Sequence, residues 1–338
     1  MRRVRILVLA LMSVIFTGTA QGQGVVVDHS SLTLFDQIPE EYLRAAASMK
    51  MMFVDRSVGG FINEGLTCLS HESDEVAPTP CKTYIHIVPE FSSPASEVDW
   101  SRPSGYDRSN WRYYGWPGIG IPPELPCGPG TTSGWSRFIE CFIDFVDANP
   151  AAYEVYSFQL SYLEVLPGSS IASPTDGYFV PQARSFDIAD FEALQARHPN
   201  RVFVHHTTSL ARGIGTQEST DFNDRQRAYV REHAGYLLDV AAIESHDPWG
   251  RPCYDNRDGV PYIIDGVVRE NHPDDGLALP AICQHYTREV DGGHPTAPDV
   301  GKIRLAKAFW VLMARIAGWN PDGQGETPDS PTNLRIIR

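Results

Sequence analysis

The sequence predicts an α/β fold in which a mainly parallel sheet lies between two layers of helices, a three-layer α/β/α sandwich. Short apolar runs of strand length, such as residues 51–54 and 201–205, alternate with longer segments whose apolar residues recur at helical spacing. This alternation favours a parallel sheet, because each helix returns the chain to the start of the next strand. The length of 338 residues suits one large domain with a sizeable core.

Each expected element follows from a local signal. Residues 39–50 are expected to form a helix, because Pro39 suits the start of a helix and two acidic residues follow it. Residues 136–149 carry apolar side chains at helical spacing, and Pro150 ends that helix. Further helices are expected from Phe61 and over residues 187–198, 221–234 and 300–318, and strands over residues 25–27, 51–54, 83–88, 154–166, 201–205 and 236–243.

The N-terminus has the three parts of a secretory signal. A basic start over residues 1–5 is followed by an apolar run over residues 6–16 and by small residues over 17–20. The apolar run is too short to span a bilayer, so we expect no membrane anchor. The predicted organisation is a signal peptide over residues 1–22, one domain over 25–319, and a linker and C-terminal stub over 320–338. The mature protein is expected to be secreted or periplasmic.

Six cysteines fit three disulfides in an oxidising compartment. Six cysteines allow fifteen pairings, among which sequence alone does not choose. If each cysteine pairs with its nearest neighbour along the chain, the expected disulfides are Cys68 with Cys81, Cys127 with Cys141, and Cys253 with Cys283. Metal binding is the competing use, but the sequence contains neither Cys-x-x-Cys nor His-Glu-x-x-His, so no metal is expected.

The formal net charge of -14 argues against nucleic acid or an anionic membrane as a partner. An acidic balance of this size is typical of an exported protein that stays in solution. The expected partner is instead a small-molecule or glycan ester, for the reasons that follow.

Ser57 stands at a turn between a strand and a helix. The apolar run Met51–Val54 ends at Asp55, and two glycines follow Ser57 before the helix begins. Such a turn places a serine at the carboxyl edge of the sheet, where open α/β folds hold their chemistry, and directs backbone N–H groups towards a developing oxyanion. The alternative is that Ser57 only caps the helix.

A second polar segment near the C-terminus carries Asp291 and His294, three residues apart on a glycine-containing loop that leads into a helix. Asp291 is expected to orient the imidazole of His294, and His294 to take a proton from Ser57, as in a Ser-His-Asp triad. The alternative is an ordinary turn, because Asp-Gly-Gly is turn chemistry with or without catalysis.

The segments Asp55–Gly59 and Asp291–His294 resemble the SGNH (GDSL-type) hydrolases, in a secreted bacterial branch with Ser-Val-Gly at the nucleophile. The likeness extends over about residues 30–319, and it includes residues 204–210, 239–245 and 304–319. It implies a flavodoxin-like strand order, Ser57 as nucleophile, His294 as base, Asp291 as its acid, and no cofactor. The Gly-x-Ser-x-Gly motif of ordinary α/β-hydrolases is missing from the sequence.

The chain departs from this family at the oxyanion hole. In this family, the third conserved sequence motif supplies an asparagine side chain to the oxyanion hole, whereas the strand expected at 154–166 contains no asparagine. The second conserved motif supplies a glycine N–H, and the candidates for that glycine are Gly115, Gly118 and Gly120. Gln159 and Ser161 lie on one face of that strand by period-two alternation, and either side chain is a candidate donor. Loss of one oxyanion donor lowers the rate by roughly 10²–10³-fold in other enzymes.

Residues 67–135 are irregular and aromatic, and Trp111 and Trp116 are candidates for stacking on sugar rings; the alternative is that they pack this region onto the domain. Thr207 and Thr208, just past an expected strand, are candidates for substrate contact or for turn capping. His205 and His206 are adjacent on a strand, so they point to opposite faces and do not easily share one metal ion.

The leading interpretation is a secreted serine esterase that acts by acyl transfer, with an acylated polysaccharide as the favoured substrate class. The first alternative is a catalytically inactive or weakly active relative that binds a glycan or lipid. A second alternative is a calcium-dependent adhesion protein, since Asp255–Gly259 resembles part of a calcium loop but lacks the downstream glutamate. The residues 328–337 resemble the opening strand of a fibronectin type III domain.

Overall fold

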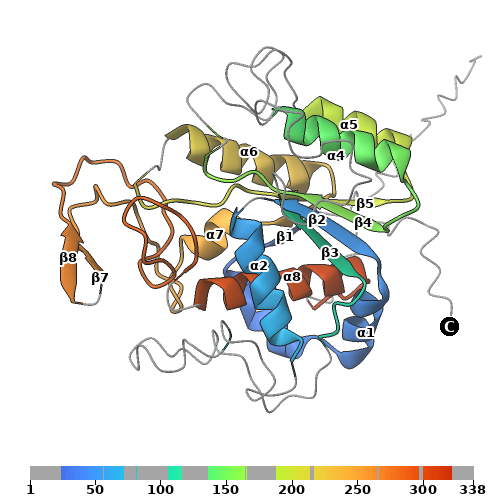
Figure 1. The fold of residues 1–338 in the computed structure, drawn as a ribbon, viewed down its shortest axis with the longest axis horizontal. Coiled ribbons are helices and arrows are strands. Elements are labelled where there is room, and N and C mark those ends of the chain that lie inside the picture. The colour runs from blue at the N-terminus through green and yellow to red at the C-terminus, as the bar shows by residue number, and fades with distance from the viewer. Residues whose placement is uncertain are drawn as a thin grey trace, which may run out of the picture.

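The computed structural model has a six-stranded parallel sheet in the order β1-β6-β5-β4-β2-β3 (Figure 1). It describes residues 24–55, 57–71, 81, 106–115, 136–163, 165, 188–213, 217–264, 266–296 and 300–321. The sheet strands are β1 (Val25–Val27), β2 (Met51–Asp55), β3 (Trp111–Gly115), β4 (Val155–Phe158), β5 (Val202–His206) and β6 (Tyr236–Leu238). The order β3-β2-β4-β5-β6 is the flavodoxin-like one, to which β1 adds a strand at the far edge.

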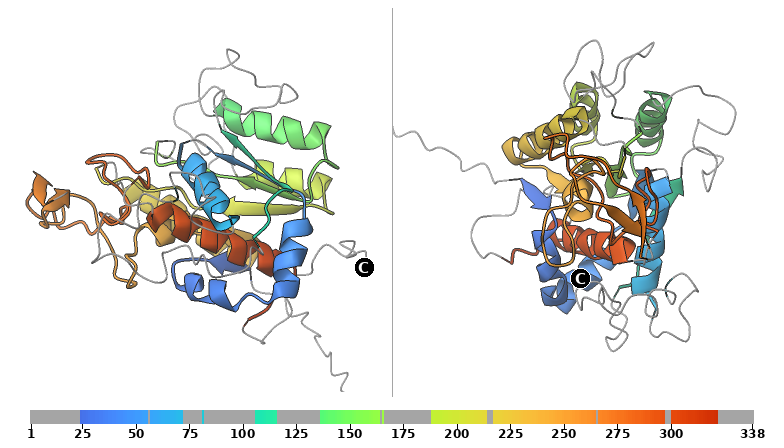
Figure 2. Two further views of the ribbon diagram at one scale, coloured as in Figure 1. Left: turned by 60° about the horizontal axis from the view of Figure 1, so that its bottom comes forward. Right: turned by 90° about the vertical axis from the view of Figure 1, so that its left-hand side faces the viewer.

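Helices cover both faces of the sheet, which confirms the three-layer prediction (Figure 2). One layer contains the 3₁₀ helix η1 (Ser30–Gln37), α1 (Glu40–Ser48), α2 (Ser57–Leu69) and α8 (Val300–Ile316). The other contains α4 (Ser136–Ala148), α5 (Ile188–Arg197) and α6 (Gln217–Glu232). Strand β2 alternates between them: Met51 and Phe53 pack into the first layer, Met52 and Val54 into the second.

Helix α8 is buried on all sides, from Gly301 to Ala314. Lys302 lies inside the domain, and its ammonium Nζ donates to Oε2 of Glu64 on α2 at 3.2 Å. The sequence pattern predicts only one apolar face for this helix. The second face is covered because α1, α2 and η1 all pack against α8.

Several boundaries differ from the prediction: α2 begins at Ser57 and not at Phe61, and α6 begins at Gln217 and not at residue 221. The run 236–243 is divided into β6 and a short helix α7 (Val240–Glu244), because the Asp239 carboxylate accepts a hydrogen bond from Ala242 N at 3.1 Å and so caps the new helix. The third expected strand ends at Phe158 rather than at residue 166. The edge strand β3 forms within a stretch that the sequence pattern leaves irregular, and the strand expected at 83–88 lies outside the described residues.

Two of the three expected disulfides are present, Cys68–Cys81 and Cys253–Cys283, with Cα atoms 5.5 and 5.2 Å apart. Cys127, expected to pair with Cys141, lies outside the described residues, as do the predicted signal peptide 1–22 and all but the first two residues of the predicted linker and stub 320–338. Within the described ranges, no helix is both long and apolar enough to cross a membrane.

The residues between α7 and α8 form an irregular insertion. It contains the antiparallel hairpin of β7 (Tyr262–Ile264) and β8 (Val267–Glu270), which projects from the body of the domain at the left of Figure 1. The segment resembling a calcium loop is a turn here: both carboxylate oxygens of Asp255 accept hydrogen bonds from Arg257. The insertion leads into the loop that carries His294.

Candidate active site

The candidate site lies at the carboxyl edge of the sheet, between the ends of β2 and β4. From β2 the chain runs outward to β3 in one direction and then returns to β4 on the opposite side, so the strand order reverses here. Ser57 follows β2 and Gln159 follows β4, and Gln159 N donates to Val54 O at 3.0 Å. Ligands of open α/β sheets bind at such a reversal.

Ser57 is the first residue of α2, and its side chain is exposed. The turn into the helix is tight, because a Cβ atom at Gly59 would lie 2.5 Å from Cβ of Asp55 and 2.9 Å from Cε2 of Tyr113. Only glycine allows this approach of the helix to the strand. The first backbone N–H groups of α2 have no partner within the helix and point towards the space beyond the strand end.

His294 lies against the first turns of α2. Its ring centroid is 5.7 Å from that of Phe61, which is one helical turn beyond Ser57 and therefore on the same side of α2. Tyr162, which packs on Val58, lies edge-on to the same imidazole at 6.3 Å. The structure thus brings His294 to the end of the helix that carries Ser57. Among the described residues, no hydrogen bond joins these two side chains.

The acid that holds His294 is Glu289, which corrects the prediction of Asp291. Nδ1 of His294 lies 2.6 Å from Oε1 of Glu289, and the backbone N of His294 donates to Oε2 of Glu289 at 3.0 Å. Asp291 is exposed and lies beside Gly213 instead. The loop folds back on itself between residues 289 and 294, which brings the earlier carboxylate to the ring and turns Asp291 outward.

Two glycines make this fold of the loop possible. A Cβ atom at Gly292 would lie 1.9 Å from Oε2 of Glu289, in the space that the carboxylate occupies. A Cβ atom at Gly293 would lie 2.0 Å from the carbonyl oxygen of Leu210. The Asp-Gly-Gly sequence is therefore a turn, and its glycines also leave room for the groups that position His294.

The insertion before α8 fixes the same loop from outside. The hydroxyl of Tyr262 donates to the carbonyl oxygens of Thr287 and Glu289 at 3.0 and 2.9 Å. Asn256 Nδ2 donates to Val290 O at 2.7 Å, and Arg212 N donates to Gly292 O at 2.9 Å. The backbone on both sides of Glu289 is thus tied to buried groups, and Cys253–Cys283 closes the insertion that supplies most of them.

Gln159 is the better placed of the two candidate oxyanion donors. Its side chain is 1% exposed, and neither amide atom has a hydrogen-bond partner among the described residues. A buried amide without partners is costly in a folded protein, which is typical of a group kept for a ligand. Ser161 is also buried, but its hydroxyl oxygen accepts a hydrogen bond from Leu163 N at 3.3 Å.

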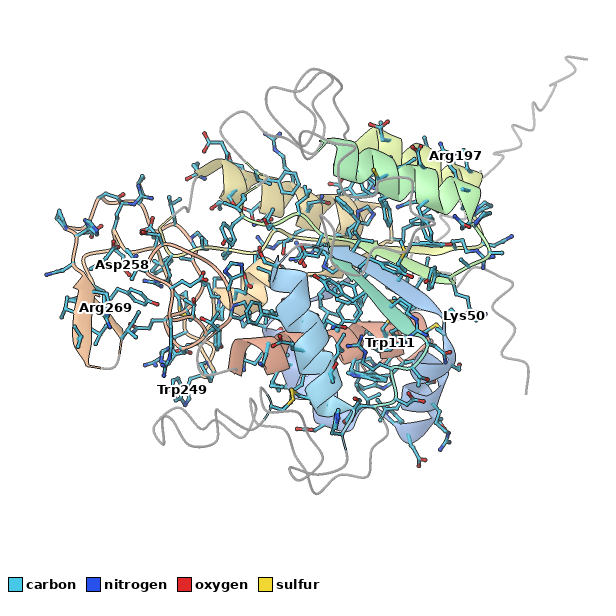
Figure 3. The ribbon with its side chains drawn as sticks, viewed as in Figure 1. Lys50, Trp111, Arg197, Trp249, Asp258 and Arg269 are labelled. Carbon is cyan, nitrogen blue, oxygen red and sulfur yellow. A yellow bond between two sulfur atoms is a disulfide. The ribbon has the colours of Figure 1, made fainter. Side chains whose placement is uncertain are left out.

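The predicted substrate contacts are structural where the structure describes them. Trp111 is 1% exposed in the body of the domain (Figure 3), and its indole Nε1 donates to Ala46 O at 3.2 Å. Thr207 donates to the Asp239 carboxylate at 3.0 Å, and Thr208 is held by Asn223. All three are too buried to contact a substrate, which is a correction.

The remaining predicted contact, Trp116, lies outside the described residues. It therefore stays a candidate for contact with a sugar ring.

The two adjacent histidines are buried in different surroundings. Nε2 of His205 lies 3.2 Å from Gln195, whereas Nε2 of His206 is hydrogen-bonded to the Ser157 hydroxyl. Burial lowers the pKa of His205 to about 4 and that of His206 to about 3, so both rings are neutral at physiological pH. No group of three or more metal-binding side chains occurs in the described part of the chain.

Sequence reasoning also missed Glu244, a buried acid behind the site. Its side chain is 1% exposed and accepts a hydrogen bond from Leu210 N at 2.6 Å through Oε2. Burial, with a further contribution from the negative charge of Asp55, raises the pKa of Glu244 well above its ordinary value. Glu244 thereby fixes Leu210, whose carbonyl contacts Gly293 next to His294.

Comparison with known proteins gives no relative from which function could be transferred: no family model matches the chain, and no curated protein or solved structure matches it significantly.

Proposed function

We propose that this protein is an exported serine ester hydrolase of the SGNH type that acts through an acyl-enzyme on Ser57. The observation that carries the proposal is the state of His294. Its Nδ1 is held by the Glu289 carboxylate, while its Nε2 is buried without a partner among the described residues, at the end of the helix that begins with Ser57. A histidine oriented by an acid on one nitrogen and open on the other is the arrangement of a general base.

Glu289 determines which nitrogen of His294 acts as the base. A carboxylate against Nδ1 favours the tautomer with the proton on Nδ1, and this leaves the lone pair on Nε2. Nε2 would accept the proton of Ser57 as its oxygen attacks the ester carbonyl, and would return it to the leaving alcohol. A water molecule would then be deprotonated by the same nitrogen to release the acid, and the charge of Glu289 would stabilise the imidazolium in both steps.

The oxyanion would be held by two kinds of donor. The first N–H groups of α2 lack partners within the helix, and the positive end of the helix dipole lies at the same place. The amide Nε2 of Gln159 would be the side-chain donor, in place of the asparagine that the family supplies. A preorganised donor is worth about 10²–10³-fold in rate.

The substrate class is inferred from the expected location of the protein outside the cell and from its aromatic residues. Two disulfides fit an extracellular protein, and the predicted signal segment adds to this inference. We propose an acylated polysaccharide as substrate, since exported esterases of this kind meet polymers and since the sequence makes Trp116 a candidate for stacking on a sugar ring. No cofactor is needed for the reaction.

One observation favours the second candidate, a binding protein without activity. Ser57 and His294 do not share a hydrogen bond, and in such a protein they would have no need to. The geometry of a free enzyme often tightens only when substrate binds, so the same observation is compatible with catalysis.

Labelling with a fluorophosphonate probe separates the two functions, since such probes react with a serine that a neighbouring base activates. We expect the wild-type protein to be labelled and the Ser57→Ala and His294→Ala variants to remain unlabelled. Ser161→Ala, which removes a buried serine next to the site, is the matched control and should be labelled normally. A folded wild-type protein that is not labelled would rule out the enzyme and favour the binding protein.

A further inference from the structure

A separate cavity of about 700 Å³ lies between the outer side of α2 and the start of β3. Its polar lining comes from Asn63 and Thr67 on α2, from Ser70 just after α2, and from Asp107, Arg108, Ser109 and Arg112 before and in β3. Trp111, labelled in Figure 3, also borders it. At a rise of about 1.5 Å per residue, Asn63 and Thr67 lie about 9–15 Å from Ser57 along α2, so the cavity is distinct from the candidate active site.

The cavity contains two arginines that neutral groups hold in place. Nη1 of Arg108 donates to the carbonyl oxygen of Asn63 at 2.7 Å, and Nη2 donates to the side-chain oxygen of the same residue. Nη1 of Arg112 donates to Ser109 O at 2.9 Å. Burial, together with the nearby charge of Arg112, lowers the pKa of Arg108 to about 10, so the Arg108 guanidinium is still charged at neutral pH.

Among the described residues, neither arginine forms an ion pair with a carboxylate, although Asp107 lines the same cavity. Asp107, which also lines the cavity, uses its carboxylate on Ser109, with Oδ1 accepting from N at 2.9 Å and Oδ2 from Oγ at 3.2 Å. Other arginines of the chain differ: Arg227 pairs with Asp239 at 2.6 Å, and Arg257 with Asp255 at 2.7 Å. The lining thus has two arginines against one aspartate, in a chain of net charge -14.

We propose that this cavity binds an acidic saccharide, with its carboxylate or sulfate group on Arg112 and Arg108. Guanidinium groups match the planar, bidentate geometry of oxyanions. The hydroxyl oxygens of Thr67, Ser70 and Ser109 and the amide of Asn63 supply partners for sugar hydroxyls. The volume falls in the range of small-molecule sites, about 300–1,000 Å³, which is larger than a free inorganic anion needs.

The test is calorimetric titration of the full-length exported chain with an oligosaccharide of galacturonic acid, with the methyl ester of the same oligosaccharide, and with inorganic sulfate. We expect the acid form to bind, the ester form to bind at least 10-fold more weakly, and sulfate to bind more weakly than the acid form. Arg112→Gln and Arg108→Gln should each weaken the acid form about 10-fold or more. Arg44→Gln, an exposed arginine on α1, is the matched control and should bind like the wild type.

Binding of the acid and ester forms with equal affinity would overturn the proposal, as would binding that both cavity variants retain. Sulfate binding as tight as that of the acid form would overturn the assignment to a saccharide. Ser57→Ala should bind normally, so the outcome is independent of the proposed ester hydrolysis. Arg112 is exposed, so its variant is expected to fold even if Arg108→Gln does not.

Discussion

One carboxylate, that of Glu289, holds both the ring and the backbone of His294. Oε1 lies 2.6 Å from Nδ1 of the imidazole and Oε2 lies 3.0 Å from the backbone N of the same residue. The two contacts fix the position of the residue and the direction of its ring together. The carboxylate is itself confined, because it fills the space that a side chain at Gly292 would need. This arrangement singles out Glu289 from the other acids of the loop.

Glu289→Gln is therefore expected to lower kcat/KM for ester hydrolysis by about 10²–10⁴-fold, because the amide does not stabilise an imidazolium and can favour the wrong tautomer. Asp291→Asn should stay within about threefold of the wild type, since its carboxylate is exposed and does not contact the ring. The measurement is steady-state hydrolysis of a p-nitrophenyl ester, with near-ultraviolet circular dichroism to confirm the fold. A larger loss in Asp291→Asn than in Glu289→Gln would restore Asp291 as the acid.

Gln159→Ala is expected to lower kcat by about 10²-fold with little change in KM, because an oxyanion donor acts in the transition state and not on the bound ester. The variant also removes two buried amide atoms without partners, so its free energy of unfolding should not fall by much. Ser161→Ala, two residues away, provides the comparison. If Gln159→Ala raised KM and left kcat unchanged, Gln159 would be a substrate-binding residue and not an oxyanion donor.

Tyr262→Phe tests whether the insertion positions the catalytic loop. The variant removes one hydroxyl and with it the hydrogen bonds to Thr287 O and Glu289 O. We expect a loss of about 10-fold in the rate of fluorophosphonate labelling, because the backbone of Glu289 is no longer held on that side. Tyr254→Phe, on the same insertion, is the control and should be labelled at the wild-type rate. Normal labelling of Tyr262→Phe would mean that the loop is positioned without the insertion.

The sequence was informative where a single local signal decides the structure. The apolar run 51–54, ended by a polar residue and two glycines, predicts β2 and a turn into a helix at Ser57, although the helix begins at Ser57 itself and not at Phe61. Fold class follows in the same way from strands that alternate with helices. These features depend on neighbours along the chain, so an isolated sequence contains them.

Features that depend on distant contacts were harder to predict. Asp291 and Glu289 both precede His294, and only the close packing around Gly292 and Gly293 decides which carboxylate reaches the ring. Trp111 stands in an aromatic stretch that is typical of a sugar-binding loop, but pairing with β2 makes it part of the core. The charge of Lys302 predicts a surface position, whereas its ion pair with Glu64 lets it lie inside.

Glu244→Gln is expected to change how stability depends on pH. Burial raises the folded-state pKa of Glu244 well above 4.5, so the folded protein binds this proton more tightly than the unfolded chain does. The contribution to stability is fully present below about pH 4.5 and is lost as pH rises towards the raised pKa, by at most about 1.4 kcal/mol per pH unit. Glutamine has no such proton to lose.

The free energy of unfolding of Glu244→Gln should therefore increase relative to that of the wild type as pH rises from 4.5 to 8, which means that the variant becomes relatively more stable. Urea denaturation at several pH values measures this difference, in which titrations common to both proteins, such as those of His205 and His206, cancel. Glu218→Gln, on the first turn of α6, is the control for removing a carboxylate elsewhere in the protein. A difference between Glu244→Gln and the wild type that does not vary with pH would mean that Glu244 is ionised in the folded protein. The contact with Leu210 N would then be a charged hydrogen bond, and the buried charge would need a neighbouring group to balance it.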